Sequence, residues 1–342
     1  MSETADSTIE FDYLRIVAII CLFFVHSPLA SFFSLQIGLV WHYFLSCFLF
    51  SAGYFGYLSL NKYGTRRFFK RRLVDLYVPF VLVMVLYYVF GQLQHADPKA
   101  LGAYAFFLNN FELLQQGSFN LGHFWFIPYL FSFYILHVAM EKITKNNLIQ
   151  FVVVSALFTL NAYGWSIGSS FRFGGQFSVF VYVFWAGWWL AKKGVVREIY
   201  KLKWTPLLVA VVTATAMFFT NLWTIPDQPR FLFFTAYYFD ANILALTSIF
   251  LSLVLLSRIK INSKFDRAIG TFAATSLWIY LLEPYLSNVL TWSLTWGRYA
   301  GLYGLGLTDT LLYLPMRVIF VSIIAFMSQS FYRAALRHPR LL

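Results

Sequence analysis

The stretch FDYLRIVAIICLFFVHSPLASFFS, residues 11–34, places an arginine and a histidine in an otherwise apolar helix. Arg15 and His26 are eleven residues apart, a spacing that returns almost to the same azimuth of an α-helix, so the two side chains share one face. Their axial separation is about 16 Å. If Arg15 lies at one membrane interface, His26 lies near the middle of the hydrocarbon. Ionisable groups at that depth usually face a bundle interior or a wet cavity. We therefore predict that the rest of the chain is arranged around this pair.

The composition indicates a polytopic membrane protein. Over 342 residues, 60% are hydrophobic and 12% are charged, which is far from the balance of a soluble domain. The N-terminal segment MSETADSTIE lacks the basic flank of a secretory signal, so we expect the first helix to remain as a span. Cys21 and Cys47 both fall in predicted helices and suggest neither a disulfide framework nor a metal site.

Ten apolar runs approach or exceed the length of about 20 residues that a transmembrane helix requires. They lie at residues 12–34, 39–60, 73–92, 122–140, 148–163, 177–191, 205–223, 234–257, 268–290 and 307–330. The fifth and sixth runs are short and the eighth has an indistinct start, so the count is open by one. We expect an all-α bundle of about ten transmembrane helices that forms a single domain over residues 1–342.

The basic residues predict the orientation of these spans. The segment NKYGTRRFFKRR, residues 61–72, carries six Lys or Arg between the second and third spans. If this loop is cytoplasmic, alternation places twenty Lys and Arg on the cytoplasmic side and four outside, which is the positive-inside asymmetry. Both termini are then cytoplasmic, and a multi-pass protein of the cell membrane is expected. Topology and anionic lipid explain the net charge of +12, so we predict no nucleic-acid partner.

Five stretches together resemble one known family. LRIVAIICLFFVH, preceded by Asp12, resembles the arginine, ten residues, histidine signature in the first helix of the acyltransferase 3 family of membrane O-acyltransferases. YFLSCFLFSAGY resembles the second helix of that family, and RRFFKRRLVDLYVPF resembles the basic entry to its third. GHFWFIPYLFSFYIL is similar to its His-x-Trp-Phe-Leu helix, and SLWIYLLEPYL to its penultimate helix. The resemblance runs over nearly the whole chain and corresponds to a stand-alone membrane domain.

Three positions depart from the family pattern. Cys47 stands where a glycine is usual, and Glu283 replaces a commonly found histidine. The family often repeats an arginine three residues after the one that matches Arg72, and here that position is Asp75. These departures bear on how the donor is bound and on what surrounds His26.

The resemblance implies an enzyme that moves an acyl group, with acetyl favoured, from cytoplasmic acyl-CoA to a hydroxyl of a glycan or lipid-linked sugar. A neutral imidazole on His26 suits a general base. Arg15 can hold a donor phosphate or carbonyl, and Asp12, one turn earlier, can orient its guanidinium. The expected donor-binding residues, which a topological role explains equally well, are Arg66, Arg67, Lys70, Arg71 and Arg72. Acetyl-CoA or another acyl-CoA is the expected donor substrate, and no tightly bound cofactor is predicted.

Glu283 and Arg317 reach a depth near that of His26 if the ninth and tenth spans form a hairpin. A plain ion pair between them is one interpretation, and a glutamate that orients His26 or the acceptor is the other. His123 and Trp125, near an outer span end, are candidate contacts to the acceptor, and Asp12 and Arg317 are further candidate substrate-binding residues. The alternative functions are a secondary transporter or polysaccharide exporter with midplane charges, and a sensor or scaffold without catalysis. The sequence shows neither an inverted repeat nor paired interrupted helices that would favour transport.

Overall fold

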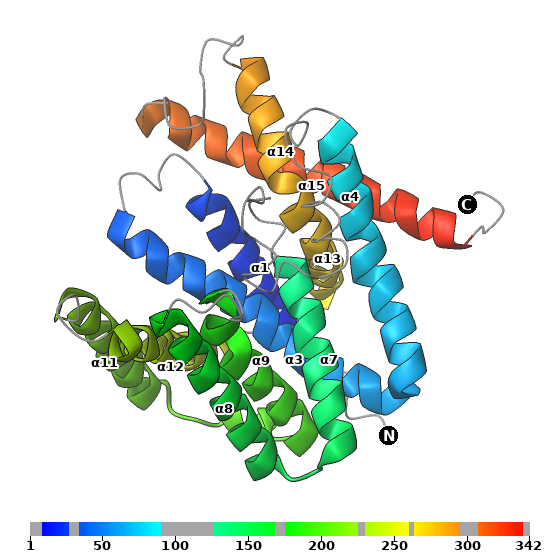
Figure 1. The fold of residues 1–342 in the computed structure, drawn as a ribbon. Helices are drawn as coiled ribbons and strands as arrows, with labels where there is room; N and C mark the ends of the chain where they lie inside the picture. The colour runs from blue at the N-terminus through cyan, green and yellow to red at the C-terminus, as the bar shows by residue number, and fades with distance from the viewer. Residues whose placement is uncertain are drawn as a thin grey trace. The chain divides into compact units, whose positions relative to one another are not determined.

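The computed structural model describes residues 9–26, 34–89, 126–167, 175–224, 230–259, 263–294 and 307–337. All regular structure within these residues is helical, as the sequence predicts (Figure 1). The chain divides into two compact units. The first consists of Met1–Leu45 and Lys260–Leu342, and the second consists of Ser46–Ile259.

The first unit is built on contacts between segments from opposite ends of the chain. Its helices are α1 (Ile9–Val25), the start of α3 (Ser34–Arg72), α13 (Ser263–Ala274), α14 (Ser276–Leu294) and α15 (Leu307–Arg337). Helix α1 packs against α13 and α14, and α14 packs against α15 (Figure 1). The buried stripe of α1 repeats every three or four residues, at Phe11, Leu14, Ala18 and Leu22. This period keeps one face of α1 turned toward the other helices.

The predicted ninth span, 268–290, is two helices rather than one, because the helix is interrupted at Thr275, between α13 and α14. Gln329 of α15 stabilises the break. Its Nε2 donates to the Ala274 carbonyl at 2.6 Å, and its Oε1 lies 2.9 Å from the Thr275 hydroxyl. Side chains that satisfy terminal backbone groups favour a helix end at that point. Glu283 therefore lies only about 10 Å into α14, and not near the far end of a long span.

The second unit contains the rest of α3 and all the helices that follow it up to residue 259. These are the π-helical segment η1 (Leu73–Tyr77), α4 (Val78–Val89), α7 (Phe126–Ile143), α8 (Asn147–Ser166), α9 (Gly175–Lys193), α10 (Val196–Tyr200), α11 (Trp204–Thr224) and α12 (Arg230–Leu256). Helix α12 packs against α8, α9 and α11, and α9 also contacts α7 and α8 (Figure 1).

Two glycines allow α3 and α9 to cross with their backbones in contact. A Cβ atom at Gly53 would lie 2.3 Å from the Phe184 carbonyl oxygen, and one at Gly187 would lie 2.1 Å from the Phe50 carbonyl oxygen. Each helix thus places a glycine against the main chain of the other. Small residues at helix crossings permit this close approach in membrane proteins, where packing replaces the hydrophobic drive between helices.

The segment 61–72, expected as a loop, is helical. Helix α3 continues through it with one break at Gly64, where φ is 71° and ψ is 167°. Glycine adopts this backbone conformation without the steric cost that a side chain adds. The basic residues after Gly64 therefore project from a helix rather than from a flexible connection, and η1 follows them directly.

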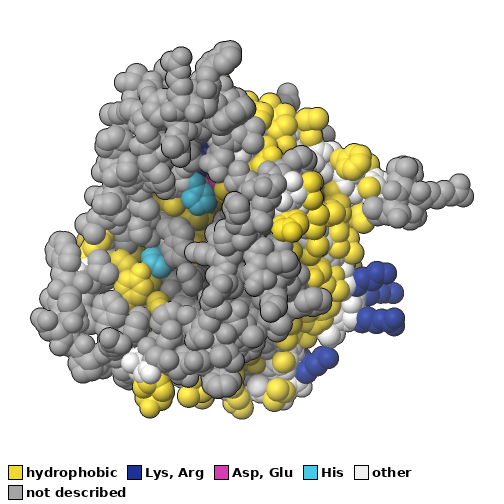
Figure 2. Space-filling model, turned by 45° about the horizontal axis from the view of Figure 1, so that its top comes forward, with side chains coloured by type: hydrophobic (Ala, Val, Ile, Leu, Met, Phe, Trp, Pro, Cys, Tyr) yellow, Lys and Arg dark blue, Asp and Glu magenta, His cyan; other side chains and the backbone are white. Residues whose placement is uncertain are grey.

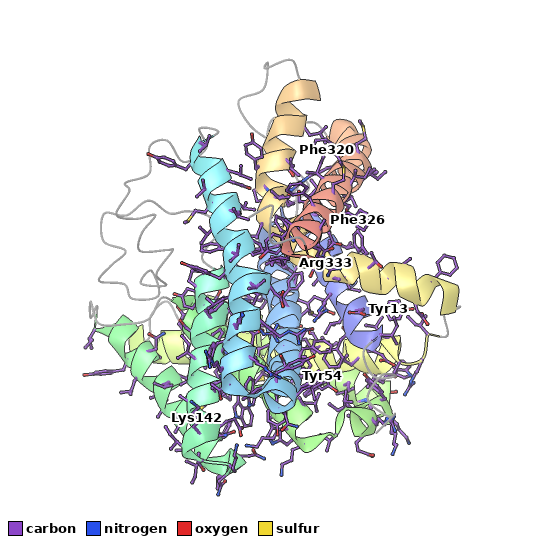
Figure 3. The ribbon with its side chains drawn as sticks, turned by 90° about the vertical axis from the view of Figure 1, so that its right-hand side faces the viewer. Tyr13, Tyr54, Lys142, Phe320, Phe326 and Arg333 are labelled. Carbon is purple, nitrogen blue, oxygen red and sulfur yellow. The ribbon has the colours of Figure 1, made fainter. Side chains whose placement is uncertain are left out.

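Five described stretches are long and apolar enough to cross a membrane. They are His42–Val89, Phe126–Ile143, Asn147–Gly164, Tyr237–Leu256 and Leu314–Leu336. Large apolar side chains are exposed along α4 and α15, among them Leu82, Val85, Ile319 and Phe326; Phe320 and Phe326 are labelled on α15 in Figure 3. Extensive exposed apolar surface suits contact with lipid. The structure thus supports a membrane protein, while the ten spans and the cytoplasmic termini stay predictions.

Candidate functional site

The centre of the first unit joins the end of α1 to the middle of α14. His26 follows the last residue of α1, and its backbone N–H donates to the Leu22 carbonyl at 3.1 Å. Its Nδ1 lies 2.7 Å from Oε2 of Glu283. The carboxylate is fully buried, whereas the imidazole is 29% exposed. The ring therefore has a fixed side and an accessible side.

Arg317 of α15 lies on the other side of the carboxylate. Its Nη2 forms an ion pair with Oε1 of Glu283, and both side chains are fully buried. Its Nη1 donates to the His26 carbonyl oxygen at 2.7 Å, and its guanidinium lies over the Phe23 ring, 5.7 Å from the centroid. A buried carboxylate is costly unless a positive charge and hydrogen bonds compensate it. Arg317 supplies the positive charge, and its Nη1 also fixes the backbone at His26.

Ser287 completes this group, and the sequence interpretation missed it. Its hydroxyl donates to Oε1 of Glu283 at 3.0 Å and accepts from Nε of Arg317 at 2.6 Å. The only signal in the sequence is the spacing of four residues after Glu283, which puts both side chains on one face of α14. A serine in an apolar helix is too common to indicate a site by itself.

The hydrogen bonds determine which nitrogen of His26 carries the proton. An ionised carboxylate only accepts hydrogen bonds, so Nδ1 is the protonated nitrogen and Nε2 keeps its lone pair. Among the described residues, Nε2 has no hydrogen-bond partner. An imidazole that a carboxylate orients from behind can take a proton from a hydroxyl placed at Nε2. The geometry is therefore that of a general base or nucleophile.

Asp12 and Arg15 lie near the beginning of α1, away from His26 along the helix. Nη1 of Arg15 is 3.3 Å from Oδ1 of Asp12, and both side chains are partly exposed. Helix α13 supports this end of α1. The Tyr13 hydroxyl, labelled in Figure 3, donates to Oδ1 of Asp266 at 3.4 Å, and a Cβ atom at Gly270 would lie 3.4 Å from Oδ2 of Asp12. The guanidinium of Arg15 is thus held by a local carboxylate but remains reachable.

The candidate donor-binding residues belong to the second unit, on the last turns of α3. Arg66, Arg67, Lys70 and Arg71 are exposed, and Arg72 is half-buried. Figure 2 shows Lys and Arg side chains gathered at one edge of a hydrophobic surface.

Arg71 and Arg72 differ from the other three because aromatic rings hold them. The Arg71 guanidinium lies 4.1 Å from the Tyr63 ring centroid. Arg72 lies 4.9 Å from the Tyr134 ring centroid and donates to the Phe55 carbonyl at 3.4 Å. Arg72 is therefore engaged by the protein itself. Asp75, which stands where the family often has arginine, is exposed in η1.

A second buried polar cluster, also missed from the sequence, lies in the second unit. The Glu141 carboxylate accepts from Lys192 Nζ at 2.7 Å, from Gln150 Nε2 at 2.9 Å and from Trp188 Nε1 at 3.3 Å. These donors come from α8 and α9, so the cluster ties both helices to α7. With so many donors, the carboxylate holds the helices together rather than taking part in chemistry.

Two sequence-predicted acceptor contacts, His123 and Trp125, lie outside the described residues.

Comparison with known proteins gives a family match over most of the chain. Residues 8–329 match the acyltransferase domain that defines the acyltransferase 3 family. The matched range contains the His26 group, the Asp12–Arg15 pair and the basic end of α3, and it extends over both units. No curated protein and no solved structure gave a match.

Proposed function

The chain belongs to the acyltransferase 3 family, and we propose that it transfers an acetyl group from cytoplasmic acyl-CoA to a hydroxyl of a glycan or lipid-linked sugar. The observation that carries the proposal is the contact between Nδ1 of His26 and Oε2 of Glu283 at 2.7 Å. It leaves Nε2 of a partly exposed imidazole available for the acceptor hydroxyl. The family supplies the reaction class, and this contact supplies the base.

In the proposed reaction, Nε2 of His26 takes the proton of the acceptor hydroxyl. The oxygen then attacks the thioester carbonyl carbon, so that a C–O bond forms as the C–S bond breaks. The CoA thiolate leaves and receives the proton from the imidazolium, which restores neutral His26. The Glu283 carboxylate stabilises the transient positive charge on the ring.

An acyl intermediate on His26 uses the same nitrogen. Here Nε2 attacks the thioester carbonyl carbon first, and the C–S bond breaks as the CoA thiolate leaves. The acceptor hydroxyl then attacks the acyl-imidazole, which releases neutral His26, and the hydroxyl proton goes to the thiolate. The two routes differ when no acceptor is present, because only the second route then forms an acylated protein. Incubation of the protein with labelled acetyl-CoA alone, followed by mass spectrometry of the peptide that contains His26, detects the label only for the second route.

The remaining residues take supporting roles in the proposal. Arg15, oriented by Asp12, binds a phosphate or the thioester carbonyl of the donor. The exposed basic side chains at the end of α3 bind CoA phosphates, for which guanidinium and ammonium groups are suited. Arg317 positions Glu283 rather than contacting substrate, because its guanidinium is fully buried. The acceptor approaches from the outer side, where His123 and Trp125 are predicted, in a single multi-pass domain of the cell membrane.

The test is an acylation assay with radiolabelled acetyl-CoA and native membrane vesicles that supply the acceptor. His26→Ala, at normal membrane levels, should abolish the appearance of acylated product. His137→Phe is the matched control, since His137 is buried in the second unit against the rings of Phe184 and Trp188 and should retain activity. Wild-type rates from His26→Ala would remove this residue from the mechanism. Uptake of substrate into liposomes without any acylated product would instead favour a transporter.

A further inference from the structure

We infer that Ser287 is a positioning residue that selects the tautomer of His26, by holding Arg317 away from one oxygen of Glu283. Its kinetic consequence rests on the proposed function, whereas the tautomer itself does not. In this role Ser287 does not contact substrate; it acts on His26 through Glu283.

The direction of both hydrogen bonds at Ser287 follows from its partners. An arginine guanidinium only donates, so the Ser287 hydroxyl must accept from Nε of Arg317 at 2.6 Å. Its single proton is then directed to Oε1 of Glu283 at 3.0 Å. Oε1 therefore accepts the hydrogen bond from Ser287 and forms the ion pair with Nη2 of Arg317, whereas Oε2 pairs with Nδ1 of His26.

The guanidinium of Arg317 competes with His26 for Oε2 of Glu283, and Ser287 limits this competition. Arginine and carboxylate groups frequently pair through two parallel N–H···O bonds, which occupy both carboxylate oxygens. Here each guanidinium nitrogen lies against a different oxygen. Nε donates to the Ser287 hydroxyl, Nη1 donates to the His26 carbonyl, and Nη2 forms the ion pair with Oε1 of Glu283. By occupying Nε, Ser287 prevents the bidentate pair that would draw Oε2 away from His26.

Without the hydroxyl, the carboxylate can turn toward the arginine, since the terminal torsion of glutamate is broad and roughly two-fold. Nδ1 of His26 would then lose its fixed acceptor, and the proton could move to Nε2. A ring protonated at Nε2 presents a donor instead of a lone pair to the accessible side. The expected loss is in turnover, while donor binding is unaffected.

The experiment combines a spectroscopic and a kinetic measurement on Ser287→Ala and Ser287→Thr. Protein labelled with ¹⁵N-histidine is reconstituted in phospholipid vesicles, and solid-state NMR reports which ring nitrogen is protonated. A difference spectrum against His26→Gln assigns the His26 signals. Turnover and the KM for acetyl-CoA are measured with native membrane vesicles as the acceptor source. Ser257→Ala is the matched control, because Ser257 follows the last residue of α12 and its hydroxyl donates to the Val254 carbonyl at 2.9 Å.

We expect wild type and Ser287→Thr to show His26 protonated at Nδ1, and Ser287→Ala to show a population protonated at Nε2. Turnover of Ser287→Ala should fall by roughly 10–100-fold, as for other orienting partners, with an unchanged KM. If Ser287→Ala does not fold, Ser287→Cys, a weaker donor, should show the same shift to a smaller extent.

Two results would overturn the inference. One is a wild-type His26 protonated at Nε2, and the other is an unchanged tautomer in the folded alanine or cysteine variant. A tautomer shift in protein that acylates nothing in any form would support the role of Ser287 and defeat the proposed transferase function. The two claims can thus fail separately.

Discussion

Glu283 and His26 meet across 257 positions of the sequence, with Oε2 of the carboxylate 2.7 Å from Nδ1 of the imidazole. The other oxygen of the same carboxylate pairs with Arg317. An ion pair with Arg317 and the orientation of His26 are therefore not alternatives, because the two oxygens make the two contacts at the same time. This double use determines what substitutions at these positions should do.

Glu283→Gln should mainly destabilise the protein, because it leaves the buried guanidinium of Arg317 uncompensated at a cost of about 3–5 kcal/mol. Glu283→Gln combined with Arg317→Met should restore the folded fraction by removing that charge. Turnover of the double variant should nevertheless stay roughly 10–100-fold below wild type, since His26 has lost its orienting carboxylate. The measurement is activity per folded molecule. Near-wild-type turnover in the double variant would show that Glu283 only neutralises Arg317.

The exposed basic residues at the end of α3 should govern the apparent KM for acyl-CoA. Charge-assisted contacts to phosphate are worth about 1.5–3 kcal/mol each, so Arg66→Glu with Arg67→Glu should raise this KM by about tenfold or more. Arg72 has the Phe55 carbonyl and the Tyr134 ring as partners, so Arg72→Gln should lower stability more than donor affinity. Lys142→Glu, an exposed charge at the end of α7 (Figure 3), is the control. Unchanged donor KM with altered orientation would assign the basic segment to topology alone.

The crossing of α3 and α9 should be sensitive to a single methyl group. Gly53→Ala and Gly187→Ala would each place Cβ within 2.3 Å of a carbonyl oxygen, so the helices must separate, at a cost of about 1–3 kcal/mol. Thermal unfolding in detergent should show both variants with a lowered Tm. Gly270→Ala is the comparison, because its added Cβ meets the nearest atom at 3.4 Å. Equal Tm values in all three variants would contradict the close crossing.

The predicted topology can be tested by labelling single cysteines in a background where Cys21 and Cys47 are replaced by alanine. Cysteines at Lys142 and Lys201, both predicted to be cytoplasmic, should react with an impermeant maleimide only after permeabilisation. Cysteines at Lys99 and Arg230 should react in intact cells. The opposite pattern, or labelling of both pairs in intact cells, would refute the ten-span arrangement.

The sequence by itself determined the helical class and identified the ionisable residues that are energetically costly to place within a membrane. Long apolar runs must be helical in lipid because every backbone group has to be satisfied internally. A charge in such a run is expensive enough to be retained only for a reason, so Arg15, His26, Glu283 and Arg317 are conspicuous without any structure. The family match over residues 8–329 confirms the resemblance to the acyltransferase 3 family.

Other features became visible only in three dimensions, because their energies depend on atoms distant in the sequence. The helix break at Thr275 depends on Gln329, the glycine crossing depends on backbone from another helix, and the role of Ser287 depends on Arg317. Burying a hydroxyl or omitting a Cβ costs far less than burying a charge. Such residues therefore occur in apolar helices for many reasons and mark no site. The sequence determined which buried groups need partners, and the tertiary structure decided which oxygen of Glu283 each partner contacts.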